Sequence, residues 1–136
     1  MHTRVVERII KALVKQKKSI AGSKVLVMGL SFKENVNDYR NSRAKQLIAE
    51  LQSYDFVVEG YDPLLSPSIL EKEFKAKPVA IPKGPYSCVI LFSPHRMFLQ
   101  DKRIWEQWAK GAVLMDIKGA LDKKTCLQAG CIYLRL

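Results

Sequence analysis

The stretch from Lys24 to Ser42 constrains the fold of this chain more than any other. Val25 to Met28 is a short apolar run, which predicts a strand that is buried on both faces of a parallel sheet. Gly29 lets the backbone turn sharply after that strand, and Ser42 opens a helix. The apolar residues of this helix recur on one face, at Ala44, Leu47, Ile48 and Leu51.

The loop between this strand and this helix is polar and carries Lys33, Asp38, Arg40 and Asn41. In an open α/β sheet, the loops at the carboxyl ends of the strands line the ligand crevice. Two long cations beside a helix N-terminus suit a polyanion such as a pyrophosphate. A solvated charged loop is the alternative that composition alone leaves open.

Apolar runs alternate with amphipathic segments along the rest of the chain, which predicts an α/β fold. We expect a Rossmann-like, doubly wound and mostly parallel sheet of five or six strands, preceded by an N-terminal helix. The predicted strands are 25–28, 56–61, 77–81 at an edge, 86–92, 112–117 and 131–134, and the predicted helices cover 2–18 and begin at Ser42, Ser66, Asp101 and Asp122. Right-handed crossovers bring the loops after four strands to one edge, and these loops carry Phe32, Lys33, Arg40, His95 and Lys118.

The 136 residues carry a formal net charge of +10, which favours anionic partners. Nucleic acid is one such partner, but the basic residues are spread along the chain and lack the interleaved aromatics of a single-strand binder. The sequence shows no apolar run as long as a membrane span and no secretory signal pattern. Three cysteines without metal-ligand spacing predict a reduced, cytoplasmic protein with no metal site. Cys88 lies in an apolar strand, so we expect a core thiol there and not a nucleophile.

Three motifs together resemble a known family. Gly29-Leu-Ser-Phe-Lys33, then Asp38-Tyr-Arg-Asn-Ser42, and further on Tyr61-Asp-Pro63, resemble the C-terminal, UDP-binding domain of the UDP-glucose/GDP-mannose dehydrogenases. The resemblance covers the chain from Met1 to about Leu121. It implies NAD-dependent oxidation of the C6 alcohol of a nucleotide sugar to a carboxylate. In the family an N-terminal Rossmann domain holds NAD and a later segment supplies a catalytic cysteine. We therefore expect the isolated chain to be inactive.

The resemblance also implies roles for single residues. Phe32 and Lys33 would contact the UDP-sugar, and Lys118 would stand where a basic residue that contacts the substrate is expected. Arg40 would reach across the cleft between domains to NAD. No catalytic residue is assigned. The first turn lacks Gly-x-Gly-x-x-Gly, so we do not expect this domain to hold NAD in the usual way.

Three further positions at this edge are singled out, and two of them, His95 and Asp62, keep alternative interpretations. Asp116-Ile-Lys-Gly119 resembles the family branch that acts on UDP-N-acetylhexosamines. His95 resembles a histidine that many family members carry in this loop, and a surface histidine that caps local backbone is the alternative. We expect Asp62 to fix the turn before Pro63, or else to face the crevice.

The N-terminal segment divides the chain into two expected parts. Residues 1–20 resemble the end of the long helix that joins the two halves of the family's enzymes and packs in their dimer, and residues 21–136 form the UDP-sugar-binding domain. An ordinary helix that covers the sheet is the alternative. The expected partners are a UDP-sugar, the N-terminal dehydrogenase half and a second subunit. A free-standing nucleotide-binding module and a basic nucleic-acid-binding domain are the other functions considered.

Overall fold

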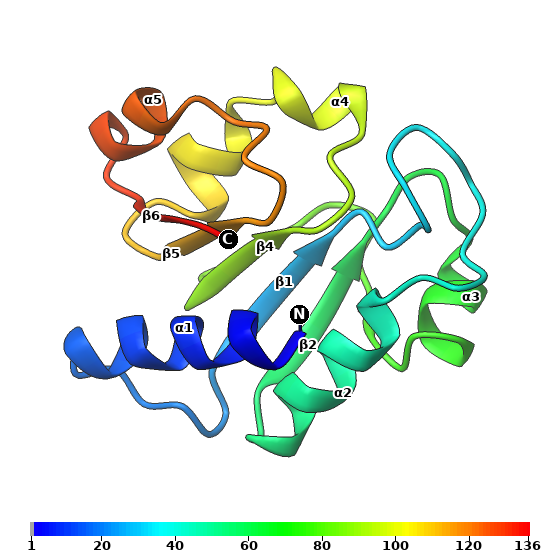
Figure 1. Cartoon of the computed structure of the whole chain (residues 1–136), viewed down its shortest axis with the longest axis horizontal. Helices are drawn as coiled ribbons and strands as arrows, with labels where there is room; N and C mark the ends of the chain where they lie inside the picture. Colours follow the sequence, from blue (N-terminus) through cyan, green and yellow to red (C-terminus); the bar gives the residue numbers. More distant parts are fainter. Residues whose placement is uncertain (1) are drawn as a thin grey trace.

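Six parallel strands and the helices on both faces of their sheet make up the computed structural model, which describes residues 2–136 (Figure 1). The strands are β1 (Lys24–Met28), β2 (Val57–Tyr61), β3 (Lys77–Pro78), β4 (Cys88–Leu91), β5 (Val113–Asp116) and β6 (Ile132–Arg135). The helices are α1 (His2–Lys15), α2 (Ala44–Ser53), α3 (Pro67–Lys72), α4 (Arg96–Leu99) and α5 (Lys123–Gln128), with a π-helical turn, η1 (Ile104–Trp108), between α4 and β5.

The strand order is β3-β2-β1-β4-β5-β6, and every pair of neighbours is parallel. This confirms the predicted doubly wound sheet and its N-terminal helix. The order reverses between β1 and β4, where Val25 to Met28 pair with Cys88 to Leu91. In sheets of this kind, ligands bind outside the carboxyl ends of the strands at the point of reversal.

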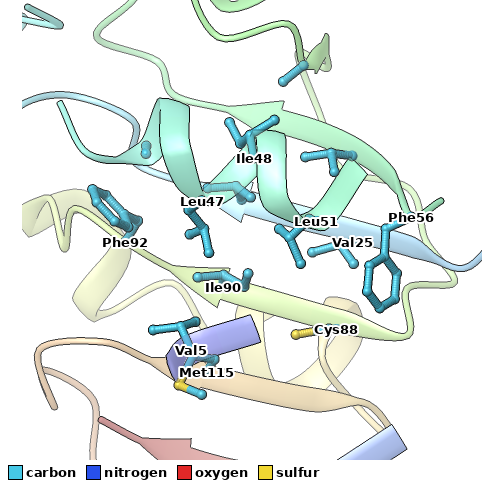
Figure 2. Packing of buried hydrophobic residues seen from close by; sticks show 14 of the residues in the cluster. Val5, Val25, Leu47, Ile48, Leu51, Phe56, Cys88, Ile90, Phe92 and Met115 are labelled. Carbon is cyan, nitrogen blue, oxygen red and sulfur yellow. The ribbon is translucent and has the colours of Figure 1, made fainter. Parts of the chain in front are cut away.

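Both faces of the sheet are covered, which explains why its strands read as unbroken apolar runs. Alternate residues of a strand point to opposite faces: Val25 and Val27 face one core cluster, and Leu26 and Met28 face the other. Helices α1 and α2 cover the first face, and α4, η1 and α5 cover the second (Figure 1). Figure 2 shows Leu47, Ile48 and Leu51 of α2 above Val25 and Ile90, and Val5 of α1 beside Met115 of β5.

The helices differ from their predicted limits in three places, the first being α1, which ends at Lys15 and not at residue 18. Helix α2 begins at Ala44, after Arg43 as its N-cap residue, and the Oγ atom of Ser42 accepts the N–H of Ala44 at 3.2 Å. The helix predicted from Asp101 is the turn η1, which begins at Ile104. The N–H of Ala109 donates to the carbonyl of Ile104, five residues back, which is the π-helical pattern. The apolar spacing in the sequence predicted which face of this segment is buried, but it could not distinguish a π turn from an α turn.

Two apolar residues counted in the sequence patterns lie outside the core. Val14 lies within the predicted helix of residues 2–18, but 59% of it is exposed, whereas Val5, Val6, Ile9 and Leu13 are fully buried. The edge strand predicted over 77–81 consists of Lys77 and Pro78 alone, and 62% of Ile81 is exposed. Pro78 has no N–H to donate, which confines this strand to the edge of the sheet.

Replacing Ile90 by Ala tests the central position of β4. Ile90 is fully buried, so truncation removes apolar contacts and leaves a cavity, and the free energy of unfolding should fall by about 2–5 kcal/mol. Ile81→Ala is the matched control because the same atoms are removed from an exposed site; it should change stability by less than about 0.5 kcal/mol. Urea denaturation of both variants measures the difference, and equal losses would place β4 outside the core.

Candidate functional site

A crevice opens at the carboxyl ends of β1, β4 and β5, where the strand order reverses. It holds a cavity of about 170 Å³ lined by Phe32, Asn41, Arg43, Phe92, Ser93, Ile117 and Lys118. Larger hollows occur elsewhere: one of about 440 Å³ lies between α1 and β6, and one of about 500 Å³ lies beside the carboxyl end of β2, but their lining residues do not come from the ends of β1, β4 and β5. We take the crevice as the candidate site because charged groups from separate loops converge there.

The crevice begins at a close contact between β1 and β4. Gly29 has a φ of +75°, and a Cβ atom built on it would lie 2.0 Å from the carbonyl oxygen of Ser93. The N–H of Ser93 donates to the carbonyl of Gly29 at 2.9 Å, so the two strand ends are bonded at this point. Only glycine combines this backbone conformation with this approach.

Hydrogen bonds shape the loop of residues 29–43 on both of its sides. The N–H of Phe32 donates to the carbonyl of Asp38 at 2.6 Å, which closes the loop on itself. The hydroxyl of Ser93 donates to the carbonyl of Ser31 at 2.8 Å and fastens the loop to the end of β4. The side chain of Phe32 remains 52% exposed at the mouth of the crevice.

Lys118 stands on a turn that a buried carboxylate holds in place. Asp116 is fully buried and accepts the N–H groups of Ala120 and Leu121 at 3.0 and 2.8 Å. It also accepts the hydroxyl of Tyr133 at 2.6 Å, and burial together with this carboxylate raises the pKa of Tyr133 to about 12. The turn therefore presents Lys118 at a fixed place beside β5.

Two cations at the edge of the crevice, Lys118 and Arg40, form ion pairs with carboxylates of the loop of residues 29–43. The Nζ atom of Lys118 lies 2.7 Å from Oε2 of Glu34, and this hydrogen bond holds the pKa of the Glu34 carboxyl below its ordinary value. Arg40 pairs with its neighbour Asp38, with Nε to Oδ1 at 3.1 Å, and 78% of its side chain is exposed. Both pairs face solvent, where an ion pair contributes little to stability.

The structure brings together only some of the residues that the sequence singled out. Phe32 and Lys118 line one cavity, whereas Lys33 and Arg40 lie on the same loop outside its lining. Sequence reasoning gave no role to Arg43, which also lines the cavity. Its signal was present: it is a cation beside the first turn of α2, at the carboxyl edge of the sheet.

His95 is not the surface histidine that the sequence left open as an alternative. It is fully buried, and it lies beneath the loop of residues 29–43. Its Nδ1 atom accepts the N–H of Asn35 at 2.8 Å, and its Nε2 atom lies 3.1 Å from both carboxylate oxygens of Asp62. Asp62 accepts the N–H of Leu64 at 2.9 Å, and so fixes the turn around Pro63 as expected.

The three cysteines are buried. Burial raises the pKa of the Cys88 thiol, and it raises those of Cys126 and Cys131 to about 12 and about 11. These thiols are protonated at neutral pH and do not act as nucleophiles. Within residues 2–136, no group of three or more His, Cys, Asp and Glu side chains is placed to hold a metal ion. None of the helices described there is long and apolar enough to cross a membrane.

Comparison with known proteins decides the family. The sequence profile of the UDP-glucose/GDP-mannose dehydrogenase family, UDP binding domain, matches residues 26–123. The chain belongs to this family. It corresponds to the UDP-binding domain, as the motifs around Gly29 and Arg40 predicted. Neither a free-standing module nor a nucleic-acid-binding domain is favoured by this result.

Curated relatives show how much of a longer protein the chain matches. It is 34% identical over 122 residues to UDP-N-acetyl-D-glucosamine 6-dehydrogenase of Pseudomonas aeruginosa, covering 88% of this chain and 29% of that protein. It is 37% identical over 120 residues to UDP-glucose 6-dehydrogenase TuaD of Bacillus subtilis, covering 85% and 26%. The chain thus spans less than a third of the length of these relatives.

Solved structures of similar proteins show the same fold. NDP-N-acetyl-D-galactosaminuronic acid dehydrogenase from Methanosarcina mazei superposes with a TM-score of 0.79 at 16% identity, over 98% of this chain and 28% of that one. The UDP-N-acetyl-mannosamine dehydrogenase Cap5O from Staphylococcus aureus gives a TM-score of 0.61 at 23% identity, over 97% and 29%.

The ion pair between Lys118 and Glu34 makes the geometry of the rim testable by titration. The pKa of Glu34 should lie below its ordinary value in the wild-type chain and rise when Lys118→Met removes the hydrogen bond. A lowered folded-state pKa means that the pair stabilises the fold above the unfolded pKa, and that this contribution is lost as the pH falls through the folded pKa. NMR titration of the Glu34 carboxyl carbon measures the shift.

Lys33→Met is the control for this titration. Lys33 acts on Glu34 through charge alone and contributes least to the shift, so this variant should move the pKa of Glu34 less than Lys118→Met. If Lys118→Met left the pKa unchanged, the loop of residues 29–43 would not extend to the end of β5 in solution.

Proposed function

We propose that this chain is the UDP-sugar-binding domain of an NAD-dependent nucleotide-sugar 6-dehydrogenase, an enzyme that oxidises the sugar C6 alcohol to a carboxylate for polysaccharide precursors. The observation that carries the proposal is the convergence of Phe32, Arg43 and Lys118 on one cavity at the strand-order reversal of a UDP-binding domain. An aromatic face and two cations suit a nucleotide with two phosphates.

The proposed substrate is a UDP-N-acetylhexosamine. Two relatives that support this choice are the UDP-N-acetyl-D-glucosamine 6-dehydrogenases of Pseudomonas aeruginosa and Salmonella typhi, each 34% identical to the chain over its matched length. The segment from Asp116 to Gly119 resembles the same branch, and its lysine lies at the cavity. UDP-glucose is the competing substrate because TuaD of Bacillus subtilis is also similar.

Each proposed contact follows from where the residue lies. Phe32 packs its exposed ring on the nucleotide sugar, and Lys118 exchanges its pairing with Glu34 for a phosphate or the sugar. Lys33, exposed beside Phe32, bonds the phosphates or the sugar. Arg40 points into solvent from the outer side of the loop, towards the proposed dehydrogenase half and its NAD.

The residues of this chain do not fit NAD as its main holder. The turn after β1 lacks the glycine fingerprint, and Asp62, which ends β2, is buried and bonded to His95 instead of facing a ribose. We therefore assign NAD and the catalytic cysteine to the other part of the enzyme. Residues 1–20 would be the end of its linker helix and 21–136 the domain proper, with the whole enzyme a homodimer in the cytoplasm.

The isolated 136-residue chain should not reduce NAD in the presence of any nucleotide sugar. Its three thiols are buried and protonated, and the chain does not provide the usual dinucleotide site. Absorbance at the NADH band, with UDP-glucose and UDP-N-acetylglucosamine tested in turn, measures this. Steady NADH production by the pure chain would refute the assignment of NAD and the catalytic cysteine to the other part of the enzyme.

Lys33 and Arg40 should serve different ligands although they share a loop. A charge-assisted contact contributes about 1.5–3 kcal/mol, so Lys33→Ala should weaken UDP binding to the isolated chain by roughly ten- to one-hundred-fold. Arg40→Ala should leave UDP binding unchanged and, in the whole enzyme, raise the KM for NAD. Calorimetric titration with UDP and kinetics with each substrate varied separate the two effects. If the two variants had equal effects, the proposed roles of Lys33 and Arg40 would be wrong, and the loop would be a solvated charged surface.

A further inference from the structure

The buried histidine at the end of β4 has a defined proton arrangement. The backbone N–H of Asn35 donates to its Nδ1 atom at 2.8 Å, so Nδ1 carries no proton. The ring proton therefore sits on Nε2, which lies 3.1 Å from each oxygen of the Asp62 carboxylate. The imidazole thus joins the loop after β1 to Asp62, the residue after β2.

The hydrogen bonds of His95 and Asp62 lie on either side of Phe32 and Lys33, two of the residues proposed to contact the nucleotide. Asp62 accepts the N–H of Leu30 at 2.8 Å, two residues before Phe32. His95 accepts the N–H of Asn35, two residues after Lys33. Asn35 has a φ of +64°, an uncommon conformation for a residue other than glycine, and its side-chain oxygen accepts the N–H of Arg96 at 2.7 Å.

We propose that His95 is a positioning residue for the nucleotide site, which holds Phe32 and Lys33 in their binding geometry through Asn35 and Asp62. This inference rests on the proposed function. His95 itself is fully buried and does not line the crevice, so it does not touch the nucleotide. It acts by ordering the loop before the ligand arrives, which lowers the entropy lost on binding.

Two substitutions separate the two bonds of the imidazole. In His95→Gln the side-chain amide can still donate to Asp62 from the place of Nε2, but nothing accepts the N–H of Asn35. In His95→Asn the side-chain oxygen can still accept the N–H of Asn35 from the place of Nδ1, but Asp62 loses its donor. A residue that mattered for stability alone would lower the melting temperature in both variants and leave the affinity of the folded protein unchanged.

The test measures UDP affinity and amide hydrogen exchange on the 136-residue chain, well below the melting temperature of each variant. His95→Gln should bind UDP roughly ten-fold more weakly than wild type, as expected for a lost buried hydrogen bond, and exchange the Asn35 amide faster. His95→Asn should keep the Asn35 amide protected and bind UDP more tightly than His95→Gln. Equal affinity in folded His95→Gln and wild type would overturn the inference.

Asn35→Ala keeps the test decisive if His95→Gln does not fold. It removes the bond from the N–H of Arg96 and disfavours the positive φ that brings the N–H of Asn35 to His95, so it should weaken UDP binding in the same direction. Unchanged affinity in that variant would also overturn the inference. If the wild-type chain does not bind UDP, the proposed function fails. Hydrogen exchange of the Asn35 amide still tests whether His95 orders the loop. Unaltered exchange of this amide in His95→Gln would refute that role of His95.

Discussion

The contact between Gly29 and Ser93 is the constraint on which the site depends. These residues end the two strands where the sheet order reverses, and a Cβ atom on Gly29 would lie 2.0 Å from the Ser93 carbonyl oxygen. Beyond this contact the chain leaves β1 for α2 on one face and leaves β4 for α4 on the other (Figure 1). The divergence of the two paths opens the crevice, so the site follows from the topology before any side chain is considered.

The ion pairs of Lys118 and Arg40 bear on how the proposed site would bind a polyanion. Lys118 and Arg40 are neutralised locally by Glu34 and Asp38, in pairs that face solvent and stabilise the fold only weakly. A diphosphate offers a denser negative charge than a single carboxylate, so exchanging partners favours the ligand. The net charge of +10 adds a long-range attraction for anions that salt screens. In the proposed function, Lys118 and Arg40 are therefore available to an anion although both are paired before it binds.

Local patterns in the sequence were enough to predict the sheet, and with it the edge on which Phe32 and Lys118 meet. An unbroken apolar run such as Val25 to Met28 signals a strand covered on both faces, and this cover is what the core clusters show. The winding of η1 was not predictable because α and π turns bury the same spacing of Ile104 and Trp108. The burial of His95 was missed for another reason: its partners lie 33 and 60 positions away, and no local pattern records a contact at such a separation.

The exposed ring of Phe32 indicates that this chain builds one wall of the proposed site. Phe32 remains 52% exposed beside three cations, Lys33, Arg43 and Lys118, so the described chain covers only part of this aromatic side chain. Ordering the loop of residues 29–43 costs conformational entropy, and the buried bonds from Asp62 and His95 meet that cost without using the groups that face the ligand. In the proposed enzyme, the opposite wall then closes over a nucleotide sugar whose phosphates this domain has already placed. In that proposal, binding and chemistry are divided between two structural units, and this domain is the one that positions the substrate.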